Sequence, residues 1–129
     1  MQTNKENLIV KTTFDFALEI IAFGELLNEK KKFQMVNQLF RSGTSIGANV
    51  REAQNAESKI DFIHKMKIAA KEADETEYWL SLCKDSPNYP DSSKLLEKID
   101  TINRILSKII STSKSRKQLS NHQITKSSN

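Results

Sequence analysis

The sequence predicts an all-α protein that folds as an antiparallel up-down-up-down four-helix bundle. Only three glycines and two prolines interrupt 129 residues, too few for an all-β fold with many turns. Apolar residues recur at spacings of three and four along four segments, which is the period of a helix with one buried face. The connections between these segments are short, so neighbouring helices must run antiparallel.

The first helix is expected to begin near Thr12 or Thr13, either of which can cap it, and to end near Glu29. It carries two apolar rows that together cover more than half of its circumference. Packing against one neighbouring helix requires a narrower apolar surface. The additional apolar surface therefore indicates deep burial of this helix or a contact with another subunit. The residues expected at a contact between copies are Phe14, Phe16, Ile20, Phe23 and Leu27.

The second helix is expected from about Phe33 to Ala56, with small residues at its centre. Gly43 and Gly47 would let a neighbouring helix approach closely, although each costs about 1 kcal/mol in helix propensity against alanine. A phosphate-binding glycine loop is excluded because neither GxxxxGK[ST] nor GxGxxG is present and no strand precedes the segment.

The third helix is expected to follow Ser58, an N-cap with Asp61 in the first turn, and to end at the turn SPNYP. The fourth begins at Ser92 or Ser93, and its apolar period stops beyond Ser111. We therefore expect a flexible N-terminus at 1–11, a bundle at 12–111 and a basic disordered tail at 112–129.

The composition predicts a cytoplasmic protein. The single cysteine, Cys83, excludes an internal disulfide framework, and its place on an apolar stripe indicates a small buried hydrophobe. The first residues lack the apolar core of a secretion signal, and no apolar run is long enough to cross a bilayer. We expect neither membrane insertion nor a small-molecule substrate.

The net charge of +4 is unevenly distributed. Six of the 20 Lys and Arg residues follow Asp100 and no acid does, which leaves 14 basic against 16 acidic residues in the body. A basic end attracts nucleic acid through phosphate contacts, or it is simply solvated. The same alternatives, nucleic-acid contact or a solvated face, apply to Arg51, Lys59, Lys67, Lys71, Lys114, Arg116 and Lys117.

Polar residues form one line on the second helix and face acids on the third. With the intervening turn near residue 57, Arg41 lies opposite Glu75, and Ser45 lies near the level of Glu72. We expect a hydrogen-bond network inside the bundle that sets the helix register. Its members are Arg41, Ser45, Asn49, Glu52, Glu72 and Glu75. Acid–base catalysis by the glutamates is the competing interpretation, but it needs a concave pocket that nothing in the sequence indicates.

A metal site is not expected. Di-metal bundles take glutamates from two helices and a Glu-x-x-His pair from each of the other two. The only histidines are His64 and His122, and Asp61 with His64 makes one imperfect match. We therefore expect no metal and no other cofactor.

Residues 41–80, RSGTSIGANVREAQNAESKIDFIHKMKIAAKEADETEYWL, resemble bacterial four-helix-bundle proteins encoded in intervening sequences of 23S ribosomal RNA genes. The family pattern is an arginine, then S-I-P-x-N-I-A-E-G, then a glutamate pair before an aromatic residue and leucine. Gly47 stands where proline is usual and Ala53 where glycine is usual, which is typical of a divergent branch. The resemblance covers roughly 12–112, and the matching residues are Arg41, Ser45, Ile46, Asn49, Glu52, Glu72 and Glu75.

This resemblance implies a left-handed up-down bundle and a homopentamer arranged as a barrel around a central channel. Related proteins include the accessory protein of diversity-generating retroelements, which binds nucleic acid and a reverse transcriptase. It therefore implies a non-catalytic homo-oligomer that contacts RNA or a nucleic-acid-processing protein. The alternative is a purely structural protein–protein interaction module without nucleic-acid binding.

Overall fold

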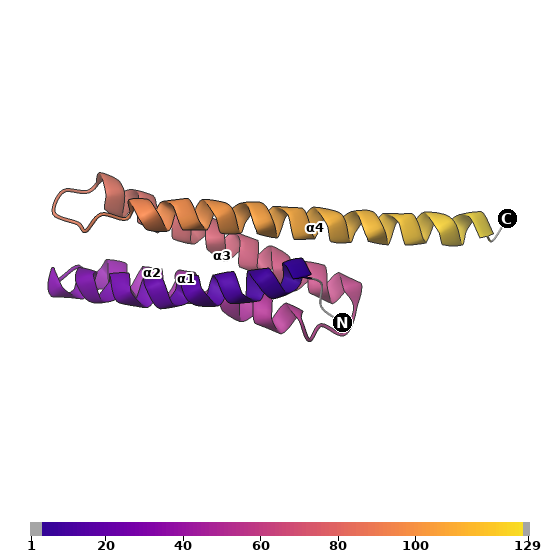
Figure 1. Cartoon of the computed structure of the whole chain (residues 1–129), viewed down its shortest axis with the longest axis horizontal. Coiled ribbons are helices and arrows are strands. Elements are labelled where there is room, and N and C mark those ends of the chain that lie inside the picture. The colour runs from indigo at the N-terminus through magenta and orange to yellow at the C-terminus, as the bar shows by residue number, and fades with distance from the viewer. Residues whose placement is uncertain (1–3, 128–129) are drawn as a thin grey trace.

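The computed structural model describes the backbone of residues 4–127 and the side chains of residues 8–116. It forms an antiparallel bundle of four helices, as Figure 1 shows, and the described residues include no strand. Helices consecutive in the chain pack against each other, and α1 also packs against α4. The helices are α1 (Asn4–Glu29), α2 (Phe33–Ala53), α3 (Lys59–Asp85) and α4 (Ser93–Ser127). The all-α four-helix prediction is confirmed.

The core is one continuous cluster of apolar side chains from all four helices. Phe16 of α1, Ile46 of α2, Met66 of α3 and Leu106 of α4 are each almost completely buried. Removing such side chains from water is the main favourable term in folding. Charged residues share every helix with the buried stripe, and none of the helices in the described range is long and apolar enough to span a membrane.

Two glycines of α2 bring it into close contact with α1. A Cβ atom on Gly43 would lie 2.9 Å from two side-chain carbons of Ile20, and one on Gly47 would lie 3.3 Å from the carbonyl oxygen of Thr13. The predicted role of these glycines is thus confirmed, and α1 is the helix that approaches them. Their absent side chains leave room that no other residue type would leave.

The first helix begins earlier than predicted. Neither Thr12 nor Thr13 caps α1, because the helix already begins at Asn4. Thr13 is buried and donates its hydroxyl to the carbonyl oxygen of Ile9, 2.7 Å away and one turn earlier. Threonine can make this bond inside a helix as well as cap one, so its presence did not mark the boundary.

The third helix begins as the sequence indicated. Ser58 has an extended backbone, and its hydroxyl oxygen accepts a hydrogen bond of 3.0 Å from the amide of Asp61. This is the N-cap geometry that satisfies an otherwise unpaired amide in the first turn. The preceding helix, α2, ends at Ala53, slightly before the expected Ala56.

The two interhelical loops at the other end of the bundle contact each other. Lys31, in the α1–α2 loop, and Asn88, in the α3–α4 loop, both have positive φ, at 62° and 66°. The ammonium group of Lys32 lies 4.7 Å from the ring centroid of Tyr89, a cation–π contact between the loops. The buried hydroxyl of Ser92 donates to the carbonyl oxygen of Leu80 at 2.7 Å, which holds the start of α4 against α3.

The last helix continues beyond the expected end of the bundle. Its apolar period stops near Ser111, yet α4 runs to Ser127 and extends well past the other three helices, as Figure 1 shows. Ser113 is still buried, so the contact with the body reaches at least that far. No glycine or proline follows Pro90, so nothing in the chain stops helix propagation. The division into a bundle and two flexible ends stays a prediction, and residues 1–3 and 128–129 lie outside the described range.

Candidate interaction surfaces

Arg41 of α2 reaches across to two glutamates of α3. Its Nη1 donates to Oε2 of Glu72 at 3.2 Å, and its Nη2 donates to Oε2 of Glu75. The side chain of Arg41 is 51% exposed and that of Glu75 is 38% exposed. The expectation that this group lies inside the bundle is therefore wrong. Apolar residues such as Leu39 and Ile46 fill the core side of α2, and the long arginine side chain extends along the helix surface.

The other expected members of the network do not contact the guanidinium group of Arg41. Ser45 donates its hydroxyl to the backbone carbonyl of Arg41, and Asn49 donates its side-chain amide to the carbonyl of Ser45 at 2.9 Å. Glu52 pairs with Lys65 of α3, with 3.1 Å between Nζ and Oε1. The expected single network is thus a three-residue group, a separate ion pair and two contacts within α2. The side chains of Ser45 and Asn49 find hydrogen-bond acceptors on the backbone of their own helix. The spacing of these residues in the sequence did not indicate this.

The ion pairs of Arg41 and Glu52 link α2 to α3, and two grooves of the described surface lie elsewhere. One groove, of about 120 Å³, lies between α1 and α2, and another, of about 240 Å³, lies between α1 and α4. Neither is lined by Arg41, Glu72 or Glu75. Pockets for small ligands usually measure about 300–1,000 Å³, so both grooves are small for that purpose.

The side chains that could support metal or thiol chemistry are dispersed. Within the described range, no three His, Cys, Asp or Glu side chains come together as metal ligands would. Cys83 is buried, and burial raises the pKa of its thiol to about 11. Since the thiolate is the reactive form, this thiol is a weak nucleophile near neutral pH.

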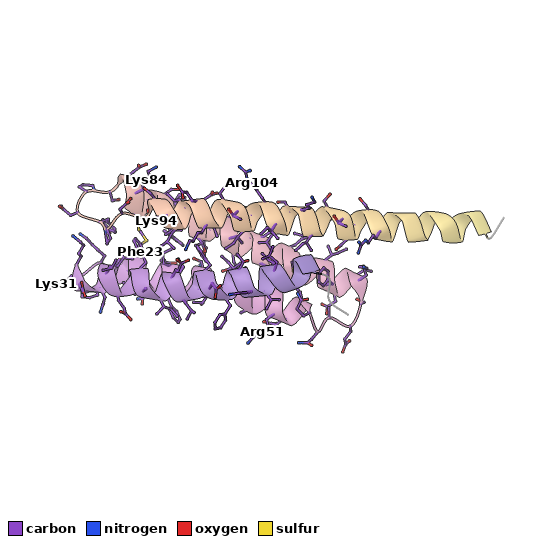
Figure 2. The ribbon with its side chains drawn as sticks, in the orientation of Figure 1. Phe23, Lys31, Arg51, Lys84, Lys94 and Arg104 are labelled. Carbon is purple, nitrogen blue, oxygen red and sulfur yellow. The ribbon has the colours of Figure 1, made fainter. Side chains whose placement is uncertain are left out.

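The expected contact residues of α1 separate into core and surface. Phe16, Ile20, Phe23 and Leu27 are each at most 5% exposed, and Figure 2 shows Phe23 between the α1–α2 and α3–α4 pairs. Their assignment to a contact between copies is wrong, because they already fill the core of their own chain. Phe14, in contrast, is 53% exposed. As the sequence predicted, α1 has more apolar surface than packing within the bundle requires. The exposed part of this surface is the row that contains Phe14.

The outward row of α1 and its neighbour on α2 make up an outer apolar face, comprising Phe14, Leu18, Ile21 and Phe40. Phe14 lines the same groove as Thr44 of α2, so the two helices share this surface. Phe40 lies one turn before Thr44 and is 54% exposed. Phe40 follows the buried Leu39 directly in the chain, and its residue type does not distinguish it from a core residue.

The basic residues considered for nucleic-acid contact do not form one continuous surface. Arg51 borders the α1–α2 groove, and Figure 2 shows it projecting from the opposite side to Arg104. Lys59 is exposed at the start of α3 and Arg116 is exposed on α4, while the side chain of Lys117 lies outside the described set.

The structure brings three of these lysines together where α3 runs beside α4. Lys67 and Lys71 are exposed one turn apart on α3, and Lys114 of α4 lies beside Lys67. The neighbouring ammonium group of Lys67 lowers the pKa of Lys114. We name Lys67, Lys71 and Lys114 the basic junction.

Comparisons with known proteins agree with the fold and with the resemblance in 41–80. The family model of the 23S rRNA-intervening sequence protein matches residues 5–108. A crystal structure of a protein of unknown function from the S23 ribosomal protein family of Bacteroides thetaiotaomicron VPI-5482 has 43% sequence identity and a TM-score of 0.78. The match covers 83% of this chain and 98% of that one. No curated protein matches. The chain belongs to the 23S rRNA-intervening sequence protein family.

Proposed function

We propose that the chain is a non-catalytic, self-associating bundle whose copies meet through the outer apolar face. The supporting observation is the exposure of Phe14, Leu18 and Phe40, each more than half accessible, on the adjoining surfaces of α1 and α2. Single exposed apolar residues are ordinary, but large side chains gathered on one surface mark an interaction site. The expected copy number is five and the expected location is the cytoplasm.

Association of copies through this face is favoured because it removes apolar side chains from water. Burying one large apolar side chain completely is worth about 1.5–3 kcal/mol, and the outer apolar face holds several that are only partly buried. Association also loses rigid-body entropy, so a single such side chain would be insufficient. Several on one face, beside a shallow groove, can exceed that loss.

Light scattering of the full chain tests this proposal. The expected result is a particle several times the chain mass of 14.7 kDa. The double substitution Phe14→Ser and Phe40→Ser is expected to give monomers. Ile60→Ser, which removes an exposed apolar residue of α3 instead, is the matched control and is expected to leave the assembly intact. A wild-type monomer, or an equal effect of the control, would contradict the proposal.

Contact with RNA or a nucleoprotein is a second candidate function. It is favoured by the basic surplus after Asp100 and by the three lysines of the basic junction. Binding that depends on phosphate contacts must weaken as salt rises, since each contact releases condensed counterions. A labelled hairpin RNA whose affinity falls with salt concentration would support it, and no binding even at low salt would contradict it.

A further inference from the structure

A second exposed apolar surface lies on α3, away from the outer apolar face. Tyr78 is 58% exposed and Leu82, one turn later, is 38% exposed. The ring of Tyr78 contacts the ring of Trp79 edge to face, with 5.2 Å between the ring centroids, which restrains its position. Among the described side chains, the other exposed large apolar residues belong to α1 or α2, except Ile60, which lies about 27 Å away along α3. We name Tyr78 and Leu82 the α3 patch.

The outer apolar face and the α3 patch point in different directions. In the described part of the chain, α1 packs beside α2 and α4 but not beside α3, so α1 and α3 lie diagonally across the bundle. The outer apolar face covers α1 and the adjoining side of α2, whereas the α3 patch lies on the outer side of α3. One copy can therefore contact two neighbours at once. Association of this kind joins unlike surfaces, and it forms a ring where the rotation closes.

The α2 side of the outer apolar face and the α3 patch carry opposite charge. Residues 30–51, which comprise most of α2 and the loop before it, include five basic residues and no acid. Residues 72–85 of α3 include five acids and one lysine. Arg41 pairs with two of these acids within the chain, but Asp74 and Asp85, one turn before and one turn after the α3 patch, are exposed. Opposite charge favours contact between these two surfaces.

The outer side of α1 has the other charge balance. Asp15, Glu25 and Glu29 are exposed there, and Lys11 is already paired with Asp15. Against this helix, the acids beside the α3 patch would meet charges of their own sign. The α2 side of the outer apolar face is therefore the better partner for the α3 patch.

The two surfaces also match in their position along the bundle. Ser42 of α2 and Thr76 of α3 are joined by a hydrogen bond of 3.0 Å, so they lie at one height. Phe40 and Tyr78 are each two residues from this bond, in the same direction because α2 and α3 are antiparallel. Phe33, two turns before Phe40 on the same side of α2, is 55% exposed. A ring around an axis parallel to the bundle keeps these heights, so it brings Phe40 of one copy level with Tyr78 of the next.

We propose that the α3 patch of one copy binds the α2 side of the outer apolar face of the next copy. Tyr78 packs against Phe40, and Asp85 faces the lysines of the α1–α2 loop, of which Figure 2 shows Lys31 at the end of the bundle. The partner is a second copy of this chain, and the inference rests on the proposed self-association. It adds that each copy uses two different surfaces. Ile60 lies outside the contact, which suits its use as a control.

Mixing two variants tests whether unlike surfaces pair. Tyr78→Ser with Leu82→Ser disables the α3 patch, and Phe14→Ser with Phe40→Ser disables the outer apolar face. Each double variant alone is expected to be monomeric, because every contact needs both surfaces. Their equimolar mixture is expected to give a particle of twice the chain mass of 14.7 kDa and no larger one, because only one intact surface of each kind remains. Light scattering over a concentration series measures all three samples.

A charge reversal separates loss of the contact from loss of the fold. Asp85 is exposed and is the last residue of α3, where a positive charge interacts favourably with the helix dipole. Asp85→Lys is therefore expected to stay folded by circular dichroism, while repulsion from the lysines of the next copy weakens association about tenfold. The matched control is Glu97→Lys, the same change at an exposed acid of α4, which is expected to alter association less than about twofold.

The possible results distinguish this inference from the self-association on which it rests. If the wild-type chain is a monomer, both are wrong. If it assembles and the double variant of the α3 patch assembles equally well, the self-association stands and only the role of the α3 patch is wrong. A mixture of the two double variants that stays monomeric would also overturn the pairing, as would equal effects of Asp85→Lys and Glu97→Lys.

Discussion

The α1–α2 and α3–α4 pairs supply the same kind of core but opposite outer surfaces. The α1–α2 pair is drawn together by Gly43 and Gly47 and exposes phenylalanines on its outer side. The α3–α4 pair exposes the lysines of the basic junction. One apolar stripe per helix is enough to specify the bundle. The residues outside that stripe decide what each pair can bind, and here they differ in chemistry.

The largest expected effect comes from neighbouring residues of α2. Leu39→Ala is expected to destabilise the chain by about 2–5 kcal/mol, because Leu39 is 1% exposed and its removal leaves a cavity. Phe40→Ala is expected to cost less than about 1 kcal/mol, because Phe40 is largely outside the core. Both are measured by urea unfolding in a Phe14→Ser background, which removes the contribution of association to stability.

Equal destabilisation by these two substitutions would mean that Phe40 packs within its own chain. The α1–α2 pair would then lack an outer apolar face, and its contrast with the α3–α4 pair would disappear. In the otherwise wild-type chain, Phe40→Ala should also remove the dependence of the melting temperature on protein concentration.

Alanine substitutions at the glycines test the close approach of α1 and α2. At Gly43 the new Cβ would lie 2.9 Å from Ile20, and the resulting strain is expected to outweigh the gain in helix propensity by about 1 kcal/mol. At Gly24 the nearest contact would be 3.7 Å, from Val36, so Gly24→Ala is expected to stabilise the chain by about 0.5–1 kcal/mol. Thermal unfolding measures both. Stabilisation by Gly43→Ala would show that the helices are farther apart than described.

Local features of the fold could be predicted from the sequence. Ser58 caps α3 and Gly43 permits close helix packing through their own backbone and nearest neighbours. The residue type alone therefore indicates the role. The start of α1 could not be predicted in this way. Thr13 has the residue type of a cap, but its hydroxyl bonds to the preceding turn inside a helix that begins at Asn4.

The surfaces were harder to predict, because they depend on where the other helices lie. Two apolar rows on α1 look equivalent in sequence, and only the positions of α2 and α4 place Phe16 in the core and Phe14 outside it. The antiparallel register sufficed to bring Arg41 opposite Glu75. The register did not indicate how deeply these ion pairs are buried, since an arginine can reach its partner along the surface as well as through the interior.

A double-mutant cycle on Arg41 and Glu72 measures how firmly the two helix pairs are joined. We expect a coupling free energy of about 0–1 kcal/mol, because the guanidinium is half exposed and water screens the interaction. The variants are Arg41→Gln, Glu72→Gln and their combination, compared by urea unfolding. The matched control is a cycle on Lys11 and Asp15, an exposed pair within α1, for which about 0.3–0.5 kcal/mol is expected. A coupling above about 2 kcal/mol would indicate that the Arg41 group is desolvated after all.

The smallest effects are expected in the two loops, where the helix pairs have different residue types at a position of positive φ. Lys31 and Asn88 both have positive φ, but asparagine tolerates that conformation far better than lysine does. Lys31→Gly is therefore expected to stabilise the chain by about 0.5 kcal/mol, since relief of backbone strain exceeds the added flexibility of the unfolded chain. Asn88→Gly should change stability by less than about 0.3 kcal/mol, because it relieves little strain. Lys31 neighbours Lys32, which contacts Tyr89, so Lys32→Gln serves as the control for loss of charge in this loop. Urea midpoints that rise for Lys31→Gly alone would place the strain in the α1–α2 loop, whereas a rise for both glycine variants would show that the two pairs share it.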